Sequence, residues 1–274
     1  MEHKRNQRKP YPERREGAKE RRPATPREEN EIGNGAVIGR NAVRELLRSG
    51  RAVDKLLVQS GPREGALVPL VGEAIARGIP VVETERRKLD TLANFAPHQG
   101  VIALAAEKEY CSVDDIIAYA RSKKQEPFIL IADGINDPHN LGALIRCAEA
   151  AGCHGIIIPK RRSVTLNATV AKASAGAIEH MLVAKVTNLG VAVDDLKKKG
   201  VWIYAAEADG QDIDTVDIVT PAAFVLGSEG QGVSRLIREK SDFVLSIPMK
   251  GRVNSLNVSS AGAVILFHAR RYFN

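Results

Sequence analysis

The sequence lacks long apolar runs and has few cysteines. No stretch reaches the roughly 18 consecutive apolar residues of a membrane-spanning helix, so we expect no membrane span. The basic first ten residues are followed by no apolar stretch, so we expect no secretory signal. The three cysteines form no Cys-x-x-Cys pair, which argues against a disulfide framework. Together these absences predict a protein of the reducing cytoplasm, with Cys147 and Cys153 as buried thiols among small apolar residues.

Several motifs of nucleotide, metal and hydrolase chemistry are also missing. There is no Gly-x-Gly-x-x-Gly between a first strand and helix, and the glycines of residues 227–232 have another spacing. A Gly-x-x-x-x-Gly-Lys-Ser/Thr loop and a Gly-x-Ser-x-Gly elbow are absent. Without His-Glu-x-x-His or a His-x-Glu…Cys-x-x-Cys pattern, we expect no metal site.

The positive charge is concentrated at the N-terminus. Residues 1–30 hold ten Lys and Arg against six Asp and Glu, which is +4 of the chain's total of +7. These residues include no Val, Ile, Leu, Phe or Trp, so we predict a disordered basic tail over residues 1–35. Such a tail can contact the phosphates of a nucleic acid, and the alternative is a solubilising segment without a partner.

Helical and strand patterns alternate over residues 36–106, which predicts a small α/β domain. We expect Asn41 to cap its first helix, Gly50 to end that helix, and Thr84 to cap a later one. The other expected elements are strands at 54–59, 79–83 and 100–106 and a helix at 67–78. Residues 107–126 are polar around one short helix and are interpreted as a linker.

Residues 127–274 predict a second α/β domain with a parallel sheet covered on both faces, since apolar strands alternate with helices. Strands are expected at 128–133, 155–158, 182–187, 201–206, 222–227 and 243–248. Helices are expected at 140–151, 167–181, 189–200, 232–240 and about 255–272.

Three polar segments follow strands of this second domain. The first contains Asn140, a candidate helix cap, and Arg146 among apolar neighbours; the second contains Glu229 between glycines. The third contains Ser255, also a candidate cap, and Asn257. Each segment alone could be structural, as a surface arginine, a carboxylate at a helix start or a capped helix. Because ligands bind beyond the carboxyl ends of parallel strands, the three together predict one site.

The order and spacing of these segments resemble the three motifs of the SpoU/TrmH family of RNA ribose 2′-O-methyltransferases, within the SPOUT superfamily. The resemblance extends from about Phe128 to Phe273. The residues that match are Asn140 and Arg146 in the first motif; Gly227, Glu229 and Gly230 in the second; and Ile247, Pro248, Met249, Ser255, Leu256, Asn257 and Ser259 in the third.

The resemblance implies a SPOUT-type sheet with a trefoil knot, S-adenosyl-L-methionine (AdoMet) bound in the knot, and an obligate homodimer whose interface includes the last helix. Residues 36–106 resemble the family's N-terminal substrate-binding domain. Residues 98–103 and 166–180 look closest to the RlmB branch, which methylates a guanosine ribose of 23S rRNA. We therefore expect that reaction. The alternatives are 2′-O-methylation of tRNA or of another rRNA nucleotide, or a non-catalytic RNA-binding factor in ribosome assembly.

The resemblance also implies roles for individual residues. An arginine is a poor base near neutral pH, so Arg146 is interpreted as orienting the 2′-hydroxyl and stabilising the developing alkoxide, and the proton acceptor is left open. The remaining catalytic candidates position Arg146 or the nucleotide; they are Asn140, Glu229, Ser255 and Asn257. The candidates for holding AdoMet are Gly227, Gly232, Ile247, Met249 and Leu256.

Overall fold

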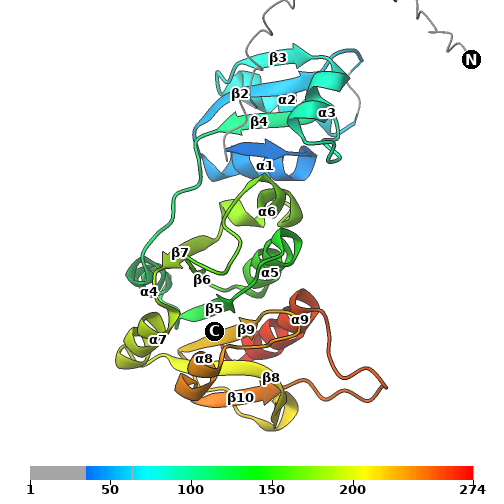
Figure 1. Cartoon of the computed structure of the whole chain (residues 1–274). Helices are drawn as coiled ribbons and strands as arrows, with labels where there is room; N and C mark the ends of the chain where they lie inside the picture. Colours follow the sequence, from blue (N-terminus) through cyan, green and yellow to red (C-terminus); the bar gives the residue numbers. More distant parts are fainter. Residues whose placement is uncertain (1–34, 63–64, 274) are drawn as a thin grey trace, which may run out of the picture. The chain divides into compact units, whose positions relative to one another are not determined.

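Four strands form the first sheet, in the order β1-β4-β2-β3 (Figure 1). The computed structural model describes residues 35–62 and 65–273, so the tail predicted at residues 1–35 lies, except for Gly35, outside the described residues. β2 and β3 are parallel, whereas β4 is antiparallel to both of its neighbours. The strands are β1 (Ala36–Ile38), β2 (Val53–Gln59), β3 (Val81–Thr84) and β4 (Val101–Ala105).

Helices cover both faces of this sheet because its strands alternate their apolar side chains. In β2, Leu56 and Val58 pack with α1 (Arg40–Ser49) and α2 (Leu67–Ala76). Leu57, between them, packs on the opposite face with Leu89 of α3 (Arg86–Leu92). The α/β alternation expected from the sequence is therefore present, with β1 as a strand that the sequence analysis missed.

Two predicted helix caps in this region are wrong. Asn41 lies inside α1, because this helix begins at Arg40. Gly39 precedes the helix with a left-handed φ of 97°, and its carbonyl accepts the N–H of Val43. Thr84 is the last residue of β3, where it pairs with Gln59, and Glu85 occupies the cap position of α3. Strand pairing therefore takes precedence over the capping preference of threonine.

Six parallel strands form the second sheet, in the order β10-β8-β9-β5-β6-β7, which confirms the predicted parallel sheet. β8 and β10 are the exception to regular pairing, since their register shifts between Val244 and Leu245. The strands are β5 (Phe128–Asp133), β6 (Gly155–Pro159), β7 (Leu182–Val186), β8 (Trp202–Asp212), β9 (Ala222–Gly227) and β10 (Phe243–Ser246).

Helices again cover both faces, as Figure 1 shows. Phe128 and Leu130 of β5 pack with one set of helices, and Ile129 and Ile131 pack with the other. The first set is α5 (Pro138–Ala151), α6 (Ala168–Ala173) and α9 (Val258–Ala269); the second is α4 (Val113–Ser122), α7 (Leu189–Lys198) and α8 (Arg235–Lys240). None of the helices in the described part of the chain is long and apolar enough to cross a membrane.

The predicted caps of α5 and α9 are also wrong. Asp137 caps α5 through its side chain, which accepts the N–H of His139 at 2.9 Å, so Asn140 lies within the first turn. Asn257 caps α9, where its Oδ1 accepts the N–H of Ser259 at 2.9 Å, so Ser255 precedes the helix. In both helices the side chain next to the first turn reaches the free N–H groups, which is the geometry that a cap requires.

The helix expected over residues 167–181 is interrupted. α6 ends at Ala173, a left-handed turn follows at Ala175 and Gly176, and the short helix η1 (Ala177–Glu179) comes next. A Cβ at Gly176 would lie 2.6 Å from Cβ of Glu45, so this turn allows the chain to pass close to α1.

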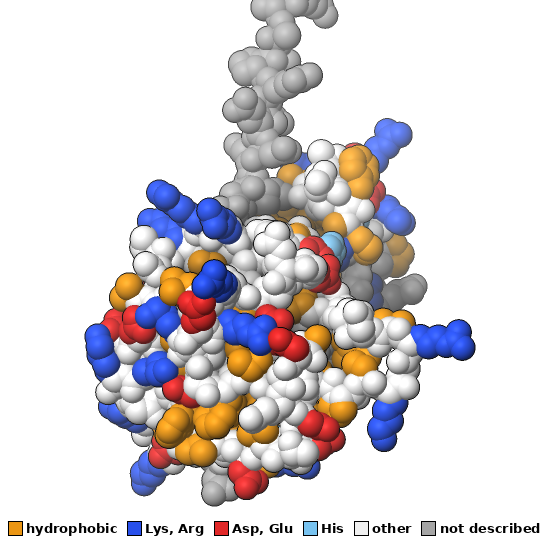
Figure 2. All heavy atoms as spheres, turned by 60° about the horizontal axis from the view of Figure 1, so that its bottom comes forward, with side chains coloured by type: hydrophobic (Ala, Val, Ile, Leu, Met, Phe, Trp, Pro, Cys, Tyr) orange, Lys and Arg blue, Asp and Glu red, His pale blue; other side chains and the backbone are white. Residues whose placement is uncertain are grey.

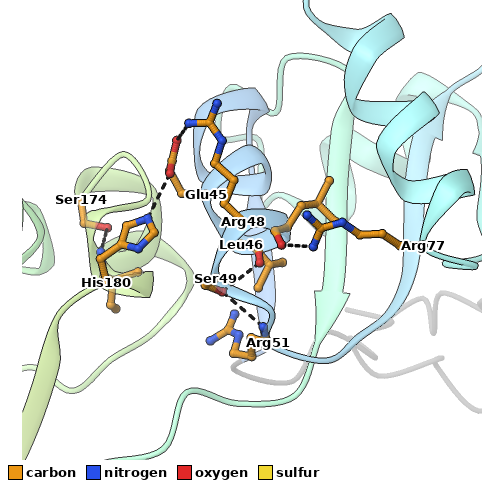
Figure 3. A network of polar contacts seen from close by, with 10 residues as sticks. Glu45, Leu46, Arg48, Ser49, Arg51, Arg77, Ser174 and His180 are labelled. Carbon is orange, nitrogen blue, oxygen red and sulfur yellow. Dashed lines mark hydrogen bonds and ion pairs between the residues drawn. The ribbon is translucent and has the colours of Figure 1, made fainter.

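Ionic contacts join α1 to η1 and the residue after it. Glu45 Oε2 lies 3.0 Å from His180 Nε2, and Arg48 lies on the other side of Glu45 (Figure 3). Beyond the C-terminus of α1, Arg51 pairs with Glu179 at 3.3 Å. The Glu179 side chain is 1% exposed, and burial raises its pKa. Charged side chains therefore connect the region of the first sheet to that of the second.

Candidate active site

A cavity of about 570 Å³ lies beyond the carboxyl ends of β9 and β10 and against the middle of β8. The register shift between β8 and β10 makes residues 206–210 of β8 protrude from the ladder, and part of this segment forms one wall. Leu226 and Leu245 form the floor at the strand ends. The other lining residues come from the loops after β9 and β10 and from the start of α9; they include Gly227, Ser228, Glu229, Gly230, Gln231, Gly232, Ile247, Met249, Asn254, Ser255, Leu256, Asn257, Val258, Ala261 and Ile265.

The loop after β9 is tightly closed. Ser228 and Gly232 exchange two backbone hydrogen bonds of 3.0 and 2.9 Å, so residues 228–232 form a compact turn. Gly227 lies directly beneath this turn, and a Cβ added to it would lie 1.9 Å from the carbonyl carbon of Gly232. Only glycine fits at position 227, because two backbone segments touch there.

Two carboxylates, from the strands on either side of β9, fix the chain after this turn. Glu207 Oε1 accepts the N–H of Val233, and Asp133 Oδ2 accepts the N–H of Ser234 at 2.7 Å. Sequence reasoning included neither carboxylate among the site residues. The signal was available, since Asp133 ends a buried strand and Glu207 directly follows the strand expected at 201–206, and ligands bind beyond the carboxyl ends of parallel strands.

Three predicted site residues, one from each motif, form a hydrogen-bonded network. Glu229 Oε1 accepts a hydrogen bond from Asn257 Nδ2 at 2.6 Å and one from Asn140 Nδ2 at 3.1 Å. Asn257 Nδ2 also donates to Asn140 Oδ1 at 3.0 Å. Asn140 is buried, and α5 supplies it, whereas Glu229 and Asn257 line the cavity. The network therefore fixes the direction of a carboxylate at the cavity wall.

The capping role of Asn257 explains why this network is rigid. Its Oδ1 accepts the N–H of Ser259 and also the Ser259 hydroxyl, the latter at 2.6 Å, while its Nδ2 belongs to the network. One amide side chain is thus held at both ends. Its rotamer is set by the start of α9 rather than by any ligand.

The other predicted residues of the third motif lie in the loop between β10 and α9, which extends away from the sheet in Figure 1. Ser255, Leu256 and Met249 line the cavity, and each is exposed. Ile247 also lines the cavity and is only partly exposed.

Arg146 is the predicted residue that the structure does not bring to the cavity. It lies on α5, it is exposed, and it does not line the cavity. Within the described part of the chain it forms no hydrogen bond or ion pair. Its neighbour Cys147 has its Sγ 4.0 Å from the carbonyl oxygen of Ser259, so this side of α5 adjoins the start of α9.

The cysteines of this domain are only partly as predicted. Cys153 is buried, whereas Cys147 is half-buried. Burial raises the pKa of both thiols, that of Cys153 strongly, which keeps both thiols protonated near neutral pH.

Two further observations concern charged groups. Among the described residues, no cluster of three or more His, Cys, Asp and Glu side chains could hold a metal ion.

On the face that Figure 2 shows, Lys and Arg side chains are interspersed with Asp and Glu, so this face presents no extended surface of one sign.

Comparisons with known proteins match both regions. The pattern of the SpoU rRNA Methylase family matches residues 127–267, and that described as RNA 2′-O ribose methyltransferase substrate binding matches residues 36–111. A relative from Bacillus subtilis, YacO, is 44% identical over 87% of this chain and 96% of its own length. A relative from Staphylococcus haemolyticus is 46% identical over 86% of this chain and 94% of its own length. Both carry the name of TrmH family tRNA/rRNA methyltransferases.

Solved structures agree with the fold. The SpoU methyltransferase AviRb from Streptomyces viridochromogenes, in complex with AdoMet, has a TM-score of 0.72 at 22% identity and covers 86% of this chain and 89% of its own. An AdoMet-bound rRNA methyltransferase from Sinorhizobium meliloti has a TM-score of 0.68 at 25% identity and covers 86% and 87% of the two chains. With the family patterns and the close relatives, these matches show that the chain belongs to the SpoU/TrmH family of RNA methyltransferases.

Proposed function

We propose that the protein transfers the methyl group of AdoMet to a ribose 2′-hydroxyl of RNA, with a guanosine of 23S rRNA as the target. The observation that carries the proposal is the network of Asn140, Glu229 and Asn257 at the cavity wall. It joins residues of the three family motifs into one polar group beside a cavity of ligand size. The substrate-binding pattern over residues 36–111 supports ribose in RNA as the acceptor.

The residues of the cavity fit AdoMet. The volume of the cavity, about 570 Å³, suits a nucleoside-sized ligand. Leu226, Ile247 and Ile265 offer apolar walls to an adenine ring. The turn of residues 228–232 brings backbone groups to the same space, where Gly227 and Gly232 let them approach closely. Leu256 and Met249 close the side formed by the β10–α9 loop. AdoMet supplies a sulfonium methyl group that is already electrophilic, so the protein's task is alignment.

Alignment is a large part of such a reaction, since correct placement of two reactants can lower a barrier by about 7–11 kcal/mol. Glu229 Oε1 accepts hydrogen bonds from the side-chain amides of Asn140 and Asn257. Its Oε2 makes no hydrogen bond within the described part of the chain. In our proposal Oε2 orients either the nucleotide or Arg146. Ser255, exposed at the cavity, contacts the nucleotide from the opposite loop.

Arg146 stabilises the alkoxide that develops on the ribose, and we propose that it does so in a homodimer. The outer face of α9 carries exposed apolar side chains, Val264 and Phe267, one turn apart. A second chain packed on this face would cover them and would bring another copy's surface near the start of α9. Because the next residue, Cys147, contacts the start of α9, and because Arg146 does not line its own chain's cavity, we propose that Arg146 serves the partner's cavity.

The division of labour within the chain is also part of the proposal. Residues 36–106 bind the RNA substrate, and residues 107–126 connect this domain to the next one. Residues 127–274 perform the methyl transfer within a trefoil-knotted SPOUT fold. The mixed charge of the face in Figure 2 favours RNA contacts elsewhere on the molecule. The basic residues 1–30, ten of them Lys or Arg, add phosphate contacts.

The test is a comparison of RNA from a strain with and without the gene. Mapping of 2′-O-methyl marks should show one guanosine of 23S rRNA that loses its mark, and the purified protein with AdoMet should restore it. A lost mark on tRNA or on another rRNA nucleotide would assign the same chemistry to another target. An unchanged methylation map, together with no methyl transfer in vitro, would favour a non-catalytic RNA-binding factor.

A further inference from the structure

The loop between α3 and β4 presents an aromatic side chain to solvent. Phe95 is 80% exposed, the highest exposed fraction among the large apolar side chains that the structure describes. Figure 1 places this loop at the end of α3, in the region that matches the substrate-binding pattern. A single exposed apolar residue is ordinary on protein surfaces, so exposure alone assigns no role.

The backbone at Phe95 is the second observation. Asn94 and Phe95 have φ values of 48° and 58°, and a bulky side chain rarely adopts this left-handed region. Such a conformation persists only where its surroundings fix it, and strained residues of this kind concentrate at functional sites.

The surroundings do fix this loop. The N–H of Asn94 donates to the Thr91 carbonyl at 3.0 Å, and the N–H of Phe95 donates to the Asp90 carbonyl at 2.7 Å. Further along, buried His98 has its Nε2 3.1 Å from Asp90 Oδ1, and its Nδ1 accepts the N–H of Gly100. The ring of Phe95 is therefore held outward by a hydrogen-bonded loop.

The third observation is charge. α3 begins with three exposed cations, Arg86, Arg87 and Lys88. Arg86 lies 3.9 Å from Asp90, but Arg87 and Lys88 form no ion pair with another described residue. The Thr91 hydroxyl donates to the Arg87 carbonyl, one helical turn earlier in α3. Thr91 itself lies about one turn before Phe95, so Arg87 and the loop lie about two helical turns apart at most.

Proteins bind unpaired nucleotides with exposed aromatic rings and with cations in the same region of the surface. Bases that are not in a duplex stack on aromatic rings, while nearby Lys and Arg contact the flanking phosphates. We propose that Phe95 stacks on an unpaired base of the RNA substrate and that Arg87 and Lys88 contact its phosphates. The inference rests on the proposed function only in taking RNA as the substrate.

The central test measures binding to a fluorescein-labelled RNA hairpin with an unpaired loop, and to the same stem closed as a blunt duplex. Phe95→Ala should weaken hairpin binding about 5- to 150-fold, the range for one lost base–aromatic stack, and should change duplex binding little. Phe95→Trp should retain hairpin binding, since a larger ring still stacks. Ile75→Ala is the matched control, because Ile75 is 61% exposed on α2 and is not aromatic.

Two further variants separate stacking from charge and from folding. Arg87→Gln should reduce the dependence of binding on salt, whereas Phe95→Ala should leave that dependence unchanged, because it removes no phosphate contact. Phe95→Gly should keep or raise the melting temperature, since glycine accepts the left-handed φ, and should still lose hairpin affinity.

Hairpin affinity unchanged in both Phe95→Ala and Phe95→Gly would overturn the inference, even if the wild type methylates RNA. A loss that is equal for hairpin and duplex would also overturn it, because a duplex offers no unpaired base. If the wild type transfers no methyl group yet the Phe95 variants lose hairpin binding selectively, the proposed reaction fails and the stacking role stands.

Discussion

Asn257 Nδ2 lies 2.6 Å from Glu229 Oε1, although 28 residues separate the two in the chain. The same amide caps α9 through its oxygen, so the start of a helix and the direction of a carboxylate are set by one side chain. Because Asn140 donates to the same carboxylate oxygen, a change at Glu229 affects two amides at once.

Glu229→Gln should therefore impair catalysis more than folding. The glutamine keeps the shape and can still accept hydrogen bonds, but it loses the charge that orients its partners, so we expect a fall in single-turnover methylation of about 100-fold. The matched control is Glu239→Gln, since Glu239 forms an exposed pair with Arg235 on α8 and such pairs contribute little. Equal activity of the two variants would remove Glu229 from the catalytic machinery.

Gly227→Ala should damage the cofactor cavity. Its Cβ would lie 1.9 Å from the Gly232 carbonyl carbon, so the turn of residues 228–232 must move. We expect AdoMet affinity in calorimetry to fall at least about tenfold, and stability to fall by about 1–3 kcal/mol from overpacking. Gly251→Ala, in the loop after β10, is the control, because its Cβ would meet no atom within 4 Å. Wild-type AdoMet affinity in Gly227→Ala would show that the turn is not part of the cofactor site.

Sequence reasoning recovered the architecture because apolar strands and amphipathic helices leave strong patterns. It predicted Asn140, Glu229 and Asn257 as site residues, and the fold brings these three together from positions 89 and 28 residues apart. It misjudged which residues cap the helices, because Asn, Asp and Ser near a helix start all satisfy the pattern and only the backbone geometry decides among them.

The contributions of Glu207 and Asp133 could not be read from a motif. Each acts through a hydrogen bond to a backbone N–H across the sheet edge, and such contacts depend on register rather than on residue spacing. The shift between β8 and β10, which makes residues 206–210 protrude, has no periodic signature in the sequence. The wall of the cavity that depends on this shift was therefore not predicted.

His154 should make stability fall in mild acid. The N–H of Phe128 donates to its Nδ1 at 3.0 Å, and its Nε2 lies 3.1 Å from Gln125 Oε1, so the bonded ring is neutral. Burial lowers the pKa of His154 below the ordinary value. A histidine with a lowered folded-state pKa contributes stability that is complete above the unfolded value of about 6.5 and is lost as the pH falls through the folded value.

His154→Asn isolates this contribution. The asparagine oxygen can accept the N–H of Phe128 but does not titrate, so urea unfolding should show a smaller loss of stability below about pH 6.5 than in the wild type. At pH 8 the variant should be less stable by about 1 kcal/mol, because the bond to Gln125 is gone. The other five histidines are common to both proteins, so parallel curves for the two would assign the acid sensitivity elsewhere.

Arg146→Ala should abolish most methyl transfer without disturbing the fold. The side chain is exposed and makes no hydrogen bond or ion pair within the described part of the chain, so the melting temperature and AdoMet affinity should stay near wild type. Turnover should fall about 100- to 1,000-fold, as it does when one donor to a developing oxyanion is lost. Arg146→Lys should restore little, because an ammonium group lacks the planar fork of the guanidinium. Near-wild-type turnover in Arg146→Ala would make Arg146 a surface residue.

Mixing two inactive variants tests whether Arg146 serves the partner's cavity. A mixed dimer contains one Arg146→Ala chain and one Glu229→Gln chain. If Arg146 acts on the partner's cavity, the cavity of the Arg146→Ala chain combines its own intact Glu229 with the intact Arg146 of the other chain. If both residues act within one chain, neither cavity has both residues intact. Random pairing makes half of the dimers mixed, so the refolded mixture should recover about a quarter of wild-type activity. The control is each variant refolded alone at the same concentration. If the mixture stays as inactive as the two variants alone, Arg146 and Glu229 act within one chain, and Arg146 must then reach its own cavity by a movement of α5.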